Sequence, residues 1–322
     1  MPAPDGPVLL LGAGTLELLG HVFDGLEDIF TGAHTLRWRH VRWGPEAESV
    51  TMPAPAIVMR ESELVEALWS ARARGVATAG CGRWCTRRPW VLSARGRDAS
   101  AARARLSFGR RRMISAEFET FEHIDETSAW IETTPGGWIF MAPMGQRRAC
   151  VQAMVADEPV DALDRLLAMV AATRDVRRHV AAPLAGASVF AAAPSLAEPP
   201  CEPGLIAVGD EAMSLDPICG DGVGHAVRGA LLAAATVGAI ARGLGTRRCL
   251  EHYRTRLETV VARHVRACQR YYAAADLAEC WAGEQEHAER ALAVVESRLA
   301  RGPACRLALR GVTLVPVGSA QR

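Results

Sequence analysis

Short apolar runs bounded by glycine and proline alternate with long helical patterns along this chain. Residues 205–208 form an apolar run of strand length between Pro203-Gly204 and Gly209-Asp210. The next long pattern, residues 223–241, is rich in alanine and predicts a helix that packs flat on a sheet. Glycines at 220 and 222 predict a tight turn before this helix, whose first backbone N–H groups would face an electron-rich ligand.

A second group of strands is predicted in the middle of the chain. The turn Thr134-Pro135-Gly136-Gly137 precedes an alternating apolar run that contains Trp138. Residues 116–121, 129–133 and 148–155 alternate in the same way and predict antiparallel partners for it. Two further patterns predict helices, an amphipathic one over residues 15–30 and a helical region beyond residue 245.

Composition narrows the function classes. The 322 residues are 49% hydrophobic with a formal net charge of +1, which predicts a large core and argues against a dedicated nucleic-acid-binding protein. No apolar run is expected to span a membrane, and the N-terminus lacks the pattern of a signal peptide, so the cytoplasm is the expected location. Nine cysteines, an odd number, fit reduced thiols better than a disulfide framework.

The segment after residue 208 carries a recognisable motif. Its pattern, G-D-x-x-x-x-x-D-P-x-x-G-x-G followed by a small-residue helix, resembles the second flavin-binding motif of a flavoprotein superfamily. This superfamily comprises the FAD-dependent monooxygenases related to para-hydroxybenzoate hydroxylase and the flavin-dependent halogenases. The resemblance implies that Asp210 holds the ribityl or pyrophosphate part of FAD. It also implies that Pro217, Gly220, Gly222 and Val223 lie against the isoalloxazine ring. The alternative is a plain strand–loop–helix unit in which Asp210 closes a turn.

Two further segments match the same family less closely. Arg60 precedes a helical pattern over residues 63–71, and the resemblance implies that it reaches the FAD phosphates. Residues 90–97 fall where the family has a strand that ends in an Asp-Ala-Thr-Gly turn, but Ser93 and Arg95 depart from that pattern. This segment therefore supports the fold more than the binding of the cofactor.

The resemblance implies an α/β fold like that of the FAD-dependent monooxygenases. An incomplete Rossmann-type flavin domain would comprise residues 1–105 and 191–245, with residues 26–55 able to join the substrate side. An antiparallel-sheet substrate domain would comprise residues 106–190. A helical C-terminal cap would comprise residues 246–322.

The start of the chain departs most from the family. The G-x-G-x-x-G turn that holds the FAD pyrophosphate is reduced to Gly12 and Gly14, with Glu17 in the third glycine's place. A carboxylate there would repel phosphate. Two alternatives to an active flavoenzyme therefore stay open: a non-catalytic scaffold that acts as an interaction or maturation protein, and a truncated gene product.

The resemblance also implies the chemistry. The family oxidises aromatic groups such as phenols, indoles, pyrroles or the tryptophan of a protein partner, with electrons from NAD(P)H or a separate flavin reductase. Halogenases of the family use a catalytic lysine and a W-x-W-x-I-P strand. This chain has no lysine, and Phe140 and Ala142 alter that signature. Hydroxylation by an FAD-dependent monooxygenase is thus preferred over halogenation, which remains an alternative.

Four other features have weaker support. His225, one turn into the helix after Gly222, titrates in a range suited to a proton shuttle, but a helix-face histidine with a structural hydrogen bond is the commoner case. Cys81 and Cys85 have a zinc-like spacing without a second ligand pair, so no metal site is expected. The run of three arginines at residues 110–112 is expected to be a solvated turn. Trp130, Trp138, Phe140 and Met144 are candidates for an aromatic pocket.

Overall fold

The computed structural model describes residues 7–23, 27–73, 90–96, 103–156, 159–277, 281–302 and 307–317. These residues form two compact units, each built from separate stretches of the chain. Unit 1 comprises Met1–Thr78, Arg110–Ala192 and Gln269–Gln285, and unit 2 comprises Ala79–Gly109, Ala193–Cys268 and Glu286–Arg322. Each unit is described by itself.

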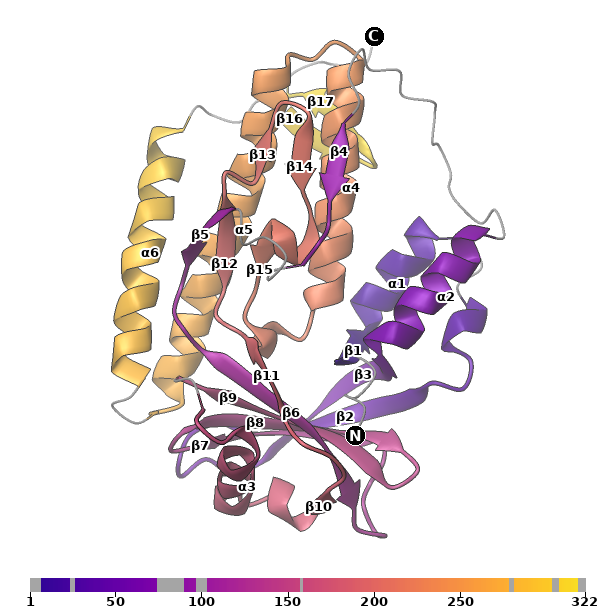
Figure 1. Ribbon diagram of the computed structural model, residues 1–322, viewed down its shortest axis with the longest axis vertical. Helices are drawn as coiled ribbons and strands as arrows, with labels where there is room; N and C mark the ends of the chain where they lie inside the picture. Colours follow the sequence, from indigo (N-terminus) through magenta and orange to yellow (C-terminus); the bar gives the residue numbers. More distant parts are fainter. Residues whose placement is uncertain are drawn as a thin grey trace. The chain divides into compact units, whose positions relative to one another are not determined.

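Unit 1 is built on one nine-stranded sheet (Figure 1). The strands run in the order β1 (Val8–Gly12), β3 (Val50–Arg60), β2 (His34–Arg42), β7 (Ser128–Thr134), β8 (Gly137–Gly145), β9 (Arg148–Val155), β6 (Arg112–Thr120) and β10 (Val180–Pro183), and β11 (Ser188–Ala191) also pairs with β6. All pairings are antiparallel except β2 with β7. The predicted antiparallel strands around Trp138 are therefore confirmed. The strands of residues 8–60 continue the same sheet.

Local sequence explains the tight turns of this sheet. Gly137 has φ +147°, and a Cβ there would lie 1.9 Å from the carbonyl oxygen of Met154 on the neighbouring strand. No other residue type fits this close approach. Gln146 and Arg147 both have positive φ, as the two central residues of a type I′ hairpin turn require.

The two faces of the sheet are covered differently. Helix α3 (Ala162–Ala172) covers one face with Leu166 and Met169, and Trp130 belongs to this core. Trp138 lies on the opposite face, because its neighbour across β7 is Thr133 whereas Trp130 pairs with Met141. The expectation that Trp130 lines a pocket together with Trp138, Phe140 and Met144 is thus wrong. Strand alternation separates it from the other three.

Two helices of unit 1, α1 and α2, each begin directly after a strand. Helix α1 (Ala13–Val22) follows β1 directly, and a 3-10 helix spans Glu27–Phe30. The helix predicted over residues 15–30 is therefore too long, since Phe23 takes an extended conformation and ends α1. Helix α2 (Glu61–Ala73) starts as predicted after Arg60, whose backbone N–H donates to Glu63 in a capping-box arrangement (2.8 Å).

Unit 2 contains three small sheets and long helices. One sheet has the order β13 (Cys201–Glu202), β14 (Leu205–Ala207), β4 (Val91–Ser93), and another has the order β15 (Met213–Ser214), β12 (Ser195–Glu198), β5 (Ala104–Ser107). A hairpin of β16 (Leu307–Arg310) and β17 (Thr313–Pro316) forms the third. As predicted, β14 is central and pairs in parallel with β4, whereas β13 runs antiparallel to it. Its helices are α4 (Gly222–Ala241), α5 (Thr246–Ala274) as far as Cys268, and α6 (Ala282–Arg301) from Glu286 onward; the other residues of α5 and α6 belong to unit 1.

Small side chains let α4 lie close to its neighbours. Ala233, Ala235 and Ala239 are buried in one core with Tyr253 and Leu257 of α5. The region beyond residue 245 is helical as predicted, but the hairpin β16–β17 was not anticipated because its alternation extends over only four residues in each strand.

Helix α4 is also long and apolar enough to cross a membrane by length and composition. The expectation that no segment has this length is therefore wrong. An alanine-rich core helix passes the same test, and the buried face of α4 in unit 2 fits that simpler explanation.

Candidate functional site

The segment between β14 and α4 forms a folded loop of short helical turns in unit 2. A 3-10 helix at Gly209–Glu211 follows β14, and a second one at Pro217–Cys219 follows β15. Asp216 starts the second turn, because its buried carboxylate accepts the backbone N–H of Ile218 (3.0 Å). Gly220 ends this turn in a left-handed conformation (φ +59°), which glycine adopts without strain.

Glu211 anchors the first turn and was missed by the sequence reasoning. Its completely buried carboxylate accepts Ser93 Oγ (2.7 Å) and the backbone N–H of Arg95 (2.8 Å), at the end of β4. Burial opposes its ionisation, but these hydrogen bonds and the Arg95 charge outweigh burial and hold the pKa of Glu211 below its usual value. One signal in the sequence could have indicated this role. Ser93 stands where the Asp-Ala-Thr-Gly pattern has its aspartate, and Glu211, directly after Asp210, supplies a carboxylate in its place.

The side chain of Arg105 also holds this turn, by hydrogen bonds to the backbone of the turn. Its guanidinium donates to the carbonyl oxygens of Glu211 (2.7 Å) and Asp210 (3.0 Å), and to Ser195 Oγ (2.8 Å). These bonds leave the Asp210 side chain exposed at the carboxyl end of β14. In open parallel sheets this end of the strands is where ligands bind.

The start of α4 offers backbone donors without a side-chain cap. Asp221 precedes the helix but makes no capping hydrogen bond, and its carboxylate pairs with Arg228 instead. A Cβ added at Gly222 would meet no atom within 4 Å, so the space beside this residue is open. Val223 follows in the first turn and is half-buried. Such a helix start attracts negative charge.

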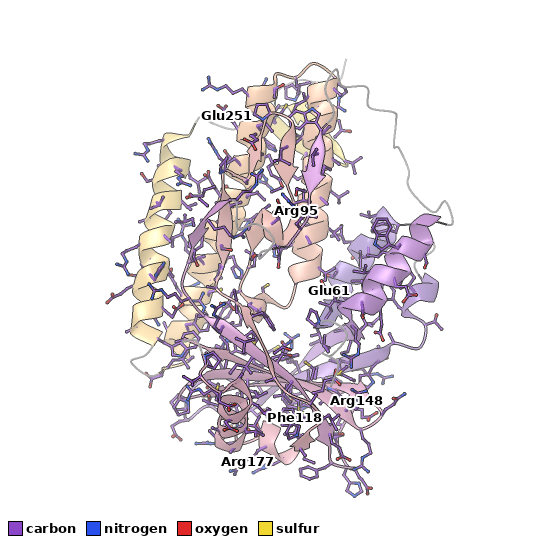
Figure 2. The ribbon with its side chains drawn as sticks, in the orientation of Figure 1. Glu61, Arg95, Phe118, Arg148, Arg177 and Glu251 are labelled. Carbon is purple, nitrogen blue, oxygen red and sulfur yellow. The ribbon has the colours of Figure 1, made fainter. Side chains whose placement is uncertain are left out.

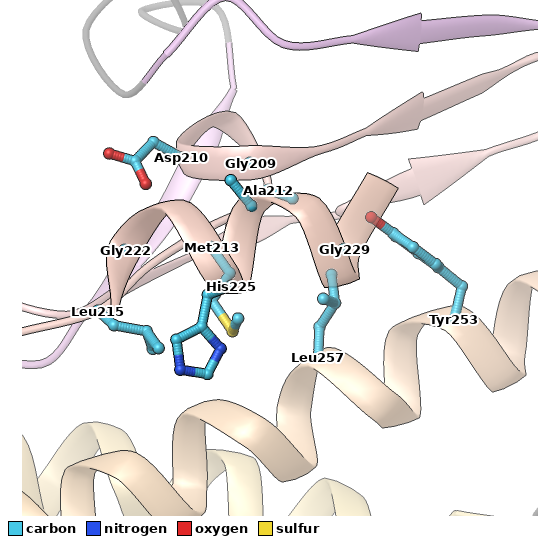
Figure 3. A pocket seen from close by; sticks show the side chains of 11 residues that line it. Gly209, Asp210, Ala212, Met213, Leu215, Gly222, His225, Gly229, Tyr253 and Leu257 are labelled. Carbon is cyan, nitrogen blue, oxygen red and sulfur yellow. The ribbon is translucent and has the colours of Figure 1, made fainter. Parts of the chain in front are cut away.

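His225 and Asp210 both line a small cavity beside the loop (Figure 3). The cavity measures about 20 Å³, room for roughly one water molecule. It is lined by Gly209, Asp210, Ala212, Met213, Leu215, Gly222, His225, Ala226, Gly229, Tyr253 and Leu257. This cavity is too small to be the flavin cleft expected beside Gly220 to Val223, which stays a prediction.

Burial also sets the charge state of this histidine. Desolvation lowers the pKa of His225, the nearby Arg228 lowers it further, and Asp221 partly opposes both. His225 is thus neutral at pH 7. Its Nε2 lies 3.8 Å from the Asp221 carboxylate.

A histidine on α5 holds the Asp216 end of the loop. The Nε2 atom of His264 accepts the backbone N–H of Asp216 (2.9 Å) and lies 3.2 Å from the Sγ of Cys268. His264 and Cys268 are four residues apart and therefore share one face of α5. Nothing in the sequence indicated that His264 would bond to the loop.

Arg60, the remaining predicted site residue, belongs to unit 1. Its guanidinium pairs with the buried carboxylate of Glu117, which also binds Arg148. Figure 2 labels Arg148 on the same sheet. Two arginines around one carboxylate leave a net positive charge, and Arg60 Nη1 is buried without a hydrogen-bond partner. This group can accept an anion without breaking the ion pair to Glu117.

Two weaker expectations have different outcomes. Arg111, in the run expected to be a solvated turn, is instead buried and pairs with Glu284 at 3.2 Å. A charged run next to a β-strand can point one side chain inward when a partner carboxylate compensates it. Cys81 and Cys85 lie outside the described residues. Among the residues that are described, no group of three or more His, Cys, Asp or Glu could hold a metal ion.

Comparison with known proteins gives structural matches only. No family model matches the sequence, and no curated protein is significantly similar to it. Peptidyl tryptophan dihydroxylase QhpG, essential for tryptophylquinone cofactor biogenesis, is 21% identical with a TM-score of 0.68, over 87% of this chain and 70% of its own. The myxobacterial chondrochloren halogenase CndH is 17% identical with a TM-score of 0.68, over 90% of this chain and 80% of its own.

A third match includes bound ligands. Aklavinone-11 hydroxylase, in a ternary complex with FAD and aklavinone, is 17% identical with a TM-score of 0.59, over 82% of this chain and 62% of its own. At identities this low the likeness establishes the fold.

Proposed function

We propose that this chain, which has the fold of the flavin-dependent halogenases and FAD-dependent hydroxylases, is an FAD-dependent oxidoreductase that hydroxylates an aromatic group. One observation carries the proposal. The loop between β14 and α4 combines an exposed Asp210, a left-handed Gly220 and an uncapped helix start with open space at Gly222. These features together suit a large, electron-rich cofactor.

Features within each unit support this proposal, each unit taken by itself. Arg60, with a buried unpaired Nη1 and a surplus positive charge around Glu117, would take a phosphate. Asp210 would accept hydrogen bonds from the ribityl or pyrophosphate part, and Pro217 with Gly220, Gly222 and Val223 would lie against the ring. When bound, FAD supplies the redox chemistry with oxygen.

The chain's own residues would prepare the site. The N-terminal dipole of α4 favours negative charge beside Gly222. Glu211 fixes the Asp210 turn through Ser93 and Arg95, and His264 fixes the following turn through the N–H of Asp216. Because the Glu211 and Asp216 side chains are buried, these contacts hold the loop in place before any ligand arrives.

Hydroxylation is favoured over halogenation by the sequence. The chain has no lysine to take part in halogen transfer, and Phe140 and Ala142 stand in altered positions of the halogenase strand. The substrate class is aromatic, by analogy with two of the matched structures, whose names state a peptidyl tryptophan and aklavinone. The electron donor would be NAD(P)H or a flavin reductase. A cytoplasmic location agrees with cysteines that form no disulfide among the described residues, such as Cys150, Cys201 and Cys249.

The experiment is an assay with chemically reduced FAD, oxygen and a panel of indoles and phenols, with and without chloride or bromide. The expected product gains one oxygen atom, at a rate independent of halide. A chlorinated or brominated product would overturn the proposal in favour of a halogenase. A purified chain that stays colourless after incubation with excess FAD would refute cofactor binding.

A non-catalytic scaffold is the second candidate, and one observation favours it. The Gly12-x-Gly14 segment follows a strand that pairs antiparallel with β3, whereas a dinucleotide-binding turn follows a parallel strand. No turnover of any substrate in the panel, by a chain that also fails to retain FAD, would shift the conclusion to this candidate.

A further inference from the structure

Arg39 on β2 is a half-buried arginine without a counter-ion. Its Nε atom is buried without a hydrogen-bond partner, and no carboxylate among the described residues lies within ion-pair distance of the guanidinium. Burial lowers the pKa of Arg39, because no neighbouring negative charge offsets it. An arginine still remains protonated at neutral pH, so the fold carries an unpaired positive charge that is partly removed from water.

Other arginines of unit 1 are treated differently. The Nε atom of Arg42, three residues further along β2, donates to Asp175 (2.9 Å), and this hydrogen bond raises the pKa of Arg42. The buried Arg111 pairs with Glu284 at 3.2 Å. An unpaired charge that is partly buried costs stability, so its presence at Arg39 indicates a binding role more than a structural one.

Strand geometry places Arg39 on the face of the sheet opposite α3. The ring of His40 stacks on Trp130, with 5.3 Å between the ring centroids, and Trp130 belongs to the core that α3 covers. Because successive side chains of a strand alternate, Arg39 lies on the other face, where its partner on β7 is Ala129. The charge therefore lies on the same face as Trp138.

An apolar surface lies next to this charge. Ala129 belongs to a small apolar cluster, and the β8 side chains of Phe140 and Met144 pack against this cluster. Trp138, at the start of β8, is 2% exposed and donates to the hydroxyl of Tyr272 (3.2 Å). Phe140 and Met144, further along the same strand, are only half-buried. Part of each side chain can therefore contact a ligand, and an apolar surface beside a free guanidinium suits an aromatic ligand with one anionic end.

We propose that Arg39 binds a carboxylate of the substrate, and that the substrate is an aromatic carboxylic acid whose ring lies against Phe140 and Met144. A guanidinium binds a carboxylate through two parallel hydrogen bonds. A carboxylate is ionised at neutral pH, whereas an unperturbed phenol is not. The inference rests on the proposed function and specifies its substrate class. Arg39 sets specificity and takes no part in the redox step.

The test compares two probes of equal size that differ in charge. Indole-3-carboxylate and indole-3-carboxamide are titrated into the full chain at pH 7, with and without excess FAD, and their affinities are measured by isothermal titration calorimetry. We expect the acid to bind about tenfold or more tightly than the amide, because only the acid forms a charge-assisted pair with Arg39.

Variants assign this preference to one side chain. Arg39→Gln should reduce the preference for the acid to about twofold or less, whereas Arg39→Lys keeps the charge without the planar fork and should give an intermediate preference. The control Arg177→Gln removes an exposed arginine of the 3-10 helix Val176–Arg178 on the α3 side of the sheet (labelled in Figure 2). This control should keep the preference of the parent chain.

Thermal unfolding without a ligand distinguishes binding from a structural role. Arg39→Met removes the unpaired charge and keeps an apolar side chain of similar length. Its unfolding temperature should therefore rise by about 2–4 °C. A structural arginine would give the opposite shift.

Several outcomes overturn the proposal. Equal affinity of the parent chain for acid and amide, or binding of neither probe, would refute a carboxylate site. An unchanged preference in Arg39→Gln would place the site elsewhere, and a lower unfolding temperature of Arg39→Met would assign Arg39 a structural role. Displacement of the acid by an equal concentration of inorganic phosphate would identify a phosphate group as the ligand instead.

The substrate assignment and the FAD function can fail independently. A preference for the acid that depends on Arg39, in a chain that neither retains FAD nor turns over either probe, would support this site and refute the FAD function. Hydroxylation of both probes at equal rates that Arg39→Gln leaves unchanged would refute the role of Arg39 and leave the function standing.

Discussion

Enlarging Gly222 separates a ligand-contact role from a structural one. Gly222 is the first residue of α4, and an added Cβ would meet no protein atom within 4 Å. Its φ is not in the left-handed region, unlike that of Gly220 at +59°. The Cβ of the substitution Gly222→Leu therefore meets no protein atom, and relief of glycine's conformational entropy offers up to about 1 kcal/mol of added stability.

The same side chain should interfere with FAD. If the ring lies against this turn, the leucine side chain occupies ligand space, and overpacking of that size costs about 1–3 kcal/mol. This cost corresponds to roughly 5- to 150-fold weaker binding. Affinity is measured by quenching of flavin fluorescence during titration, and stability by thermal unfolding without FAD.

A matched control distinguishes the two effects. Gly20 is an exposed helical glycine in α1, and a Cβ there also meets nothing within 4 Å. Gly20→Leu should leave FAD affinity within twofold. The reasoning is refuted if Gly222→Leu binds FAD as tightly as the parent chain. It is also refuted if Gly222→Leu unfolds at a clearly lower temperature, because the leucine side chain would then clash with the protein itself.

Three further predictions concern buried charge. Glu211→Gln should lower the free energy of unfolding by about 1–3 kcal/mol in urea titrations at pH 7, because the charge-assisted bonds weaken. Since the pKa of Glu211 is lower in the folded protein, its contribution is present above about pH 4.5 and is lost in acid; a parent and variant that lose stability in parallel below that pH would contradict this assignment. The pKa of His225 is lowered too, so stability should fall as pH decreases below about 6.5, and His225→Gln should remove part of that fall; identical pH profiles would refute it. Glu284→Gln removes the carboxylate charge that pairs with the buried Arg111 and should cost about 3–5 kcal/mol by chemical denaturation, whereas a loss under 1 kcal/mol would mean that water reaches the pair.

Periodicity and turn residues predicted most elements correctly. The alternating strands around Trp138 and the small-residue helix after Gly222 follow from short-range patterns, which reflect the faces that each element buries. The same logic failed at Phe23, where one extended residue ends α1 inside a continuing amphipathic pattern. Boundaries of this kind depend on neighbouring elements and not on local pattern.

The loop motif was recognisable in the sequence, but its supports were not. Asp210, Pro217 and Gly220 stand at fixed spacing, and the sequence alone indicated them. Glu211 and His264 could not be assigned in this way, because each acts through partners distant along the chain. Ser93 is 118 residues from Glu211, and Asp216 is 48 residues from His264.

By itself the sequence determined the types of the main elements, the absence of lysine and the turn chemistry of the loop, since these depend on residue identity and short-range spacing. Only the tertiary structure decided that β1 pairs antiparallel in the large sheet, that Arg111 is buried against Glu284, and that β4 ends its sheet with exposed apolar side chains. Each of these depends on which strand or helix lies beside which. Strand pairing and burial are long-range choices, and many sequence-compatible pairings differ by only a few kcal/mol.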